Sequence, residues 1–167
     1  MDRDAAFSQY AAARWRLLVR AGVLLGCSVA EAEDLAQQTL LRCYVKWAHV
    51  QRADDRDAYV ARIQLNLLRQ SRRRRWSSEV AGGDLVDGVV ADGTGRVDDA
   101  DALARALAGL SVGQRQAVVL RYYLHLSEQQ IAEATGVAPG TVKSRLSRAL
   151  TALAASPGLA ILGEGRT

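Results

Sequence analysis

Residues 127–150 read SEQQIAEATGVAPGTVKSRLSRAL, and this stretch predicts a helix-turn-helix. A short helical pattern from Ser127 to Thr135 meets Gly136, and a second helix opens at Pro139. Apolar residues of the second helix share one face, namely Val142, Leu146, Ala149, Leu150 and Leu153. Polar residues form the opposite face, namely Thr141, Ser144, Arg145 and Arg148, flanked by Lys143. A polar helix face of this kind can contact base edges in the major groove, so the chain is expected to bind DNA.

The composition favours an all-α protein with one domain or two small ones. The chain has 167 residues, of which 49% are hydrophobic, and only two are prolines. Cys27 and Cys43 form no CxxC pair, and His49 and His125 are isolated, so neither a metal nor another cofactor is predicted. Unpatterned cysteines, the lack of an apolar signal core and the lack of a membrane-spanning run predict a cytoplasmic protein without membrane insertion.

Charge divides the chain into blocks. Residues 1–76 contain 14 basic and 8 acidic residues. Residues 77–104 contain 1 basic and 7 acidic residues, and residues 105–155 contain 6 basic and 2 acidic residues. Two basic blocks around an acidic strip are typical of two modules that bind one polyanion. Solvated faces of different charge are the simpler interpretation, but the run RQSRRRR at 69–75 argues against it.

Three helices are predicted before residue 78. The first runs from about Asp4 to Leu25, and the second begins at the capping-box sequence of Ser28 and Glu31. The core stripe of the second helix comprises Ala32, Leu35, Ala36, Thr39, Leu40, Cys43 and Trp47. Its other face comprises Asp34, Gln37, Gln38, Leu41 and Val45. That mixture fits a docking surface or, equally, the edge of a wide amphipathic stripe.

Residues 50–57 are polar and are interpreted as a loop, and the third helix follows from about Asp57 to Trp76. Its inward residues are Val60, Ile63, Leu67 and Leu68. Another face carries Tyr59, Arg62, Asn66, Arg69 and Arg73 at helical spacing. Arginine and asparagine bond phosphates and base edges, and tyrosine stacks on unpaired bases. A role in solubility alone is the competing interpretation of the arginines.

The second half is expected to form a four-helix unit. Sequences of the form S-x-x-Q at Ser111 and Ser127 predict helices near 112–124 and 128–135, after a helical pattern that resumes near Asp99. The predicted organisation is a domain over 1–78, a flexible acidic linker over 79–100, a second domain over 101–156 and a tail over 157–167. No catalytic constellation is present in the sequence, so an enzyme is not expected.

Two segments in this order resemble a known family. AEAEDLAQQTLLRCYVKW at 30–47, followed by YVARIQLNLLRQSRRRR at 59–75, resembles region 2 of the extracytoplasmic-function sigma factors of bacterial RNA polymerase. The segment from Leu110 to Leu150 resembles their region 4, and the arginine run ending at Trp76 resembles an actinobacterial subgroup. The sequence departs from the family at Gln38, Leu40, Gln70 and Ala138, and Ala138 removes a side-chain cap from the second helix of the helix-turn-helix.

The resemblance implies an alternative sigma factor, a non-catalytic specificity subunit. Its partners would be core RNA polymerase, through the β′ clamp helices and the β flap, promoter DNA and, as in many members, an anti-sigma protein. Docking on the clamp helices is implied for Asp34, Leu35, Gln37, Gln38, Leu41 and Arg42. Recognition and melting of the minus-ten element are implied for the 50–57 loop and for Arg56, Tyr59, Arg62, Asn66, Arg69 and Arg73. Reading of the minus-thirty-five element is implied for Thr141, Lys143, Ser144, Arg145 and Arg148.

Two other classes share parts of this pattern. A response-regulator type of transcription factor has a similar helix-turn-helix, and it predicts self-association on half-sites about one helical turn apart. The basic third helix with Asn66 argues against it, because a sensor domain has no need of such a face. A polymerase-binding decoy with weak DNA affinity is the other alternative, and the arginine-rich surfaces argue against that as well.

Overall fold

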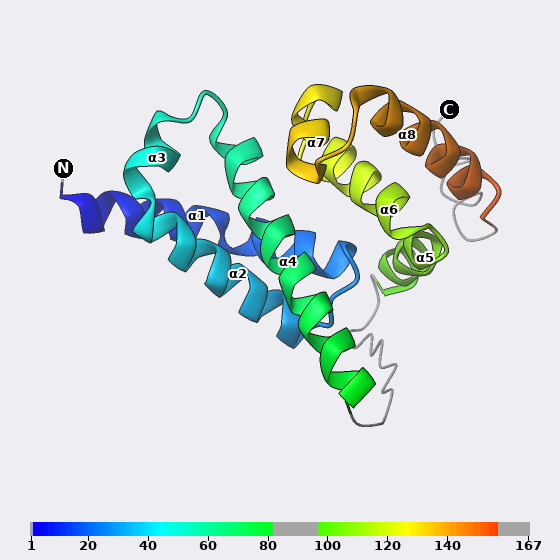
Figure 1. Ribbon diagram of the computed structural model, residues 1–167, viewed down its shortest axis with the longest axis horizontal. Coiled ribbons are helices and arrows are strands. Elements are labelled where there is room, and N and C mark those ends of the chain that lie inside the picture. Colours follow the sequence, from blue (N-terminus) through cyan, green and yellow to red (C-terminus); the bar gives the residue numbers. More distant parts are fainter. Residues whose placement is uncertain (1, 82–96, 157–167) are drawn as a thin grey trace. The chain divides into compact units, whose positions relative to one another are not determined.

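The computed structural model describes residues 2–81 and 97–156 (Figure 1). Over these ranges the chain is helical and contains no strand, which confirms the all-α prediction. Contacts divide the chain into two compact units, one built on α1–α4 and one on α5–α8. The two predicted DNA-binding faces therefore belong to different units.

The first unit packs four helices around one apolar core. They are α1 (Arg3–Leu24), α2 (Val29–Val45), α3 (Trp47–Arg52) and α4 (Arg56–Ala81). The predicted stripes of α1 and α2 meet there, since Phe7, Tyr10, Ala11, Trp15, Leu18 and Val19 pack with Ala36, Leu40, Cys43 and Trp47. Figure 1 shows α2 and α4 running beside each other across this unit. Their outward faces are left available to partners.

The turn between α1 and α2 depends on local sequence signals. Gly26 has a φ of 102°, a conformation that glycine adopts without steric cost. Ser28 accepts a hydrogen bond from the backbone N–H of Glu31, and Glu31 accepts one from the backbone N–H of Ser28, which confirms the capping box. A Cβ on Gly22 would lie 2.9 Å from the Cβ of Ala32, so glycine permits a close approach of the two helices.

The prediction of a loop over 50–57 was wrong at both ends, because only residues 53–55 lie outside a helix. The backbone breaks at Lys46 (φ −102°, ψ 25°), α2 ends at Val45, and α3 covers Trp47–Arg52. Trp47 therefore belongs to α3 and not to α2. Trp47 and Val50 lie one turn apart and are both buried, so they anchor α3 on the core. The polar neighbours of Val50 concealed this helix, and only residues 53–55 connect it to α4.

The core side of α4 contains more than the predicted residues. Val60, Leu67 and Leu68 are buried as expected, and so are Gln64 and Leu65, which the periodicity did not single out. The Gln64 Nε2 donates a hydrogen bond to the carbonyl oxygen of Leu18 at 2.8 Å. A buried amide is tolerated where it finds such a partner, and this one joins α4 to α1.

We expect Leu65→Ala to lower the free energy of unfolding by about 2–5 kcal/mol, because a fully buried leucine leaves a cavity when it is truncated. Leu65 is 1% exposed, whereas Leu41 in the same unit is 63% exposed. Leu41→Ala is therefore the matched control and should change stability by less than about 0.5 kcal/mol. Chemical denaturation followed by circular dichroism measures both. Equal losses in the two variants would contradict the assignment of Leu65 to the core.

The second unit contains α5 (Val97–Ala108), α6 (Val112–Val118), α7 (Glu128–Thr135) and α8 (Pro139–Ala154). The predicted helix over 112–124 is α-helical only to Val118 and continues as a π turn, η1, over Val119–Tyr123. The capping boxes predicted at Ser111 and Ser127 are both present and set the starts of α6 and α7.

The turn between α7 and α8 is that of the predicted helix-turn-helix. Gly136 ends α7 in the left-handed conformation, with a φ of 73°. Ala138 supplies no side-chain hydrogen bond to α8, as its sequence predicts, and Pro139 occupies the first helical turn, where its missing N–H has no cost.

The predicted linker was too long at both ends. Helix α4 continues to Ala81 and α5 begins at Val97, so the ends of the 79–100 segment are helical. The predictions of a flexible acidic connection over 82–96 and of a tail over 157–167 fall outside the described residues.

Candidate nucleic-acid interface

Helix α8 has a buried back and an exposed front. Val142, Leu146 and Ala149 are at most 6% exposed and hold the helix on its unit. The predicted reading residues Thr141, Lys143, Ser144 and Arg148 are all exposed. The front can therefore present hydroxyl, ammonium and guanidinium groups to base edges and phosphates without a change in the fold.

Two residues of α8 differ from the prediction. Leu150 was placed on the apolar back but is 44% exposed, because it lies at the edge of that stripe, about 100° around the helix axis from the fully buried Ala149. Arg145 was placed on the free front but is only half-exposed. Its guanidinium lies against Gly113 in the first turn of α6, where a Cβ would be 2.7 Å from the Arg145 Cζ.

The predicted DNA face of α4 is only partly open to solvent. Arg62, Asn66 and Arg73 are exposed, while Arg69 is half-buried. Tyr59 is partly buried against the core of the first unit, so part of its ring stabilises the fold. At the start of α4, the Arg56 guanidinium donates a hydrogen bond to the Gln51 carbonyl oxygen at 3.4 Å.

An ion pair ties the basic end of α4 to the start of α2. The Arg75 guanidinium pairs with the carboxylate of Glu31, which also closes the α2 capping box. Burial opposes ionisation of Glu31, but the backbone N–H of Ser28 and the charge of Arg75 together hold its pKa below the ordinary value. Arg75 therefore anchors the end of the arginine run, and Arg73 and Arg74 beside it are exposed.

The outer face of α2 combines polar and apolar groups. Leu41 is 63% and Val45 68% exposed, and Asp34, Gln37, Gln38 and Arg42 are also exposed. Large exposed apolar side chains rimmed by polar ones are typical of a protein-binding surface. Leu35, which was included among the docking residues, is buried on the core side of the helix and supports this face from below.

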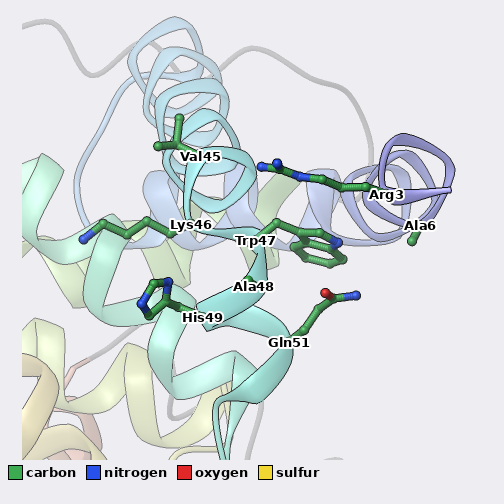
Figure 2. A pocket seen from close by; sticks show the side chains of 8 residues that line it. All are labelled: Arg3, Ala6, Val45, Lys46, Trp47, Ala48, His49 and Gln51. Atoms are coloured by element: carbon green, nitrogen blue, oxygen red, sulfur yellow. The ribbon is translucent and has the colours of Figure 1, made fainter.

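A pocket of about 470 Å³ lies where α1, α2 and α3 meet, and sequence reasoning missed it. Figure 2 shows the Trp47 indole between the side chains of Arg3 and Gln51. The Trp47 Nε1 is buried and has no hydrogen-bond partner in the described part of the chain. Apolar side chains, cations and an amide share this lining. No local sequence signal marks this pocket, because Arg3 and Ala6 come from the start of α1 and the other lining residues come from 45–51.

Residues 2–81 and 97–156 contain no cluster of three or more histidine, cysteine or acidic side chains that could hold a metal ion. In the same ranges, no helix is both long enough and apolar enough to pass through a lipid bilayer.

Known proteins resemble the chain over both units. Residues 100–153 match the family described as "Sigma-70, region 4". The RNA polymerase sigma-E factor of Streptomyces avermitilis is 37% identical over 149 residues, which cover 88% of this chain and 82% of the relative. The ECF RNA polymerase sigma factor SigL of Mycobacterium tuberculosis is 34% identical over 159 residues, covering 89% of this chain and 85% of the relative.

A solved structure shares the fold over almost the entire length. It is the sigma factor RpoE of Bartonella quintana in complex with the anti-sigma factor NepR, with a TM-score of 0.78 and 26% identity. The similarity covers 96% of this chain and 99% of that one. CnrH, solved with the cytosolic domain of CnrY, has a TM-score of 0.62 at 23% identity, which shows a common fold.

Proposed function

Because this chain belongs to the ECF sigma factors, which direct promoter-specific transcription initiation, we propose that it does so with three separate surfaces. The exposed face of α2 docks on core polymerase, α4 captures the opened minus-ten element, and α8 reads the minus-thirty-five element. The observation that carries the proposal is the division of α8 into a buried apolar back and an exposed front of Thr141, Lys143, Ser144 and Arg148.

Docking is assigned to the α2 face because its apolar groups have no role in the fold. Leu41 and Val45 are solvent-exposed, and Gln37, Gln38 and Asp34 surround them with hydrogen-bonding groups. Interfaces often place apolar anchors inside a polar rim of this kind. The proposed partner surface is the clamp-helix region of the polymerase β′ subunit, with the β flap as the partner of the second unit.

Melting is assigned to α4 and to the pocket beside α3. Arg62 and Asn66 offer donors to an unpaired strand, and the pocket supplies apolar surface for a base together with Arg3 and Lys46 for a phosphate. Capture of unpaired bases offsets the unpairing free energy, a few kcal/mol per base in base-flipping systems. On this proposal the protein melts DNA by binding, with no ATP and no catalytic residue of its own.

An anti-sigma protein is a further proposed partner. The Bartonella relative was solved in a complex with an anti-sigma factor, and the outer face of α2 in this chain has the exposed apolar groups that such a partner would cover. Because the proposed partners are polymerase and promoter DNA, the proposed place of action is the cytoplasm.

We expect Arg148→Ala to weaken holoenzyme binding to a cognate promoter by about 1–3 kcal/mol and to relax base preference at one minus-thirty-five position, because an exposed guanidinium on this front contacts a base edge. Binding to fragments with each base substituted in turn measures this. Arg105→Ala is the control, since it removes an exposed arginine from α5. Unchanged affinity and preference in Arg148→Ala would exclude this face of α8 from the groove.

A further inference from the structure

Arg145 differs from its neighbours on α8 because its side chain turns toward another helix. A Cβ on Gly113 would lie 2.7 Å from the Arg145 Cζ, 2.8 Å from Nε and 3.1 Å from a terminal nitrogen. The guanidinium therefore rests on the first turn of α6, in space that any side chain at position 113 would occupy. Gly113 has no left-handed φ, so backbone strain does not require glycine at this position.

The guanidinium of Arg145 lacks an acidic partner in the described part of the second unit. The ion pairs of the described residues, Arg14 with Asp57 and Arg75 with Glu31, both lie in the first unit, and neither Glu128 nor Glu133 on α7 forms an ion pair with Arg145. A guanidinium group presents five N–H donors in a planar arrangement. These donors can therefore bind an acceptor group on a partner molecule.

We propose that Gly113 is a positioning residue for promoter binding, because it seats Arg145 where the guanidinium donates to a phosphate of the minus-thirty-five element. The inference rests on the proposed function of α8. An arginine already held against α6 loses less conformational freedom on binding than a free one. Contacts to phosphates fix the register of a protein on DNA, while base edges are left to the exposed side chains of Lys143, Ser144 and Arg148.

Gly113→Ala tests this because it moves Arg145 without removing it. The atoms that the new Cβ would meet are the far end of a flexible side chain, so the guanidinium can leave its seat while the helices stay in place. Alanine also forms helix better than glycine, so thermal stability should not fall. Loss of DNA affinity with unchanged stability is an outcome that a merely structural role for Gly113 would not produce.

Holoenzyme reconstituted from the full chain would be titrated onto promoter duplexes at several salt concentrations. We expect Arg145→Ala to bind every minus-thirty-five variant about tenfold more weakly, as for a lost charged hydrogen bond. The slope of log affinity against log salt should become shallower by about 0.9, the value for one phosphate. Gly113→Ala should show the same uniform loss, and the double variant should be no weaker than Arg145→Ala.

Gly109→Ala is the matched control, since a Cβ there meets only the Ala106 carbonyl oxygen at an ordinary 3.5 Å. It should bind as the wild type does. Three results would overturn the inference while leaving the proposed function intact. Gly113→Ala could bind promoter DNA with wild-type affinity, or the affinity losses of the two substitutions could add in the double variant. Arg145→Ala could also change the base preference at a single position. If wild-type holoenzyme does not distinguish promoter from scrambled duplex, both are overturned.

Discussion

Reversing the charge at Asp34 together with Leu41→Arg should weaken binding to core RNA polymerase by at least about 100-fold, as expected when two central interface residues are lost. Both side chains are exposed on α2, with Leu41 63% exposed, so neither contributes to the packing of the first unit. The new arginine would place a charge where the proposed interface buries an apolar group. Affinity for purified core enzyme and helical circular dichroism would be measured on the same samples.

The matched control makes the same chemical changes on another side of α2. Glu33 and Val29 are both exposed, Val29 by 56%, and lie about one turn apart at the start of α2, rotated by roughly 100° around the helix axis from Asp34 and Leu41. Glu33→Arg with Val29→Arg should change the affinity by less than about threefold, which is the scale of exposed surface substitutions. Equal losses in the two double variants, or loss of helix in the Asp34 and Leu41 variant, would contradict docking through this face.

Substituting Arg62 and Asn66 by alanine should prevent open-complex formation on duplex promoters and spare the closed complex. The proposed contacts exist only after bases leave the duplex, so their loss removes the free energy that offsets unpairing. A template with a mismatch bubble over the minus-ten element carries no unpairing cost and should restore most of the activity. Permanganate reactivity reports melting, and abortive transcripts report initiation, on duplex and bubble templates.

An Arg148→Ala protein separates this prediction from a general loss of binding. The Arg148→Ala protein is expected to be defective in reading the duplex minus-thirty-five element. A template with a pre-opened minus-ten element should therefore restore little of its activity. Arg62 and Arg148 are both exposed arginines, and the two variants therefore lose the same charge. Equal rescue of both variants by the bubble, or normal melting by the Arg62 and Asn66 variant, would exclude α4 from strand capture.

Sequence signals predicted the elements that depend on neighbouring residues. The capping boxes at Ser28, Ser111 and Ser127 gave the starts of three helices, because each consists of residues three positions apart. The exposed face of α2 was also predicted, since its core stripe has a clear helical period and the remaining residues follow from it.

Features that join distant residues could not be predicted in this way. The hydrogen bond from Gln64 to Leu18 and the seat of Arg145 on Gly113 each link separate helices, and no local pattern marks either pair. Helix α3 was missed because Val50, which anchors it, stands beside polar residues typical of a loop. Tertiary burial, and not local propensity, decides such short helices.

Run-off transcription with purified core polymerase on a library of promoter sequences tests the central claim most directly. The claim is that this chain confers promoter-specific initiation on core polymerase. We predict defined transcript starts from a small subset of the library, dependent on the added protein and sharing two sequence elements that match the two DNA-binding units. Transcripts equal to those of core enzyme alone, or protein bound to DNA as a dimer on palindromic half-sites without polymerase, would contradict it.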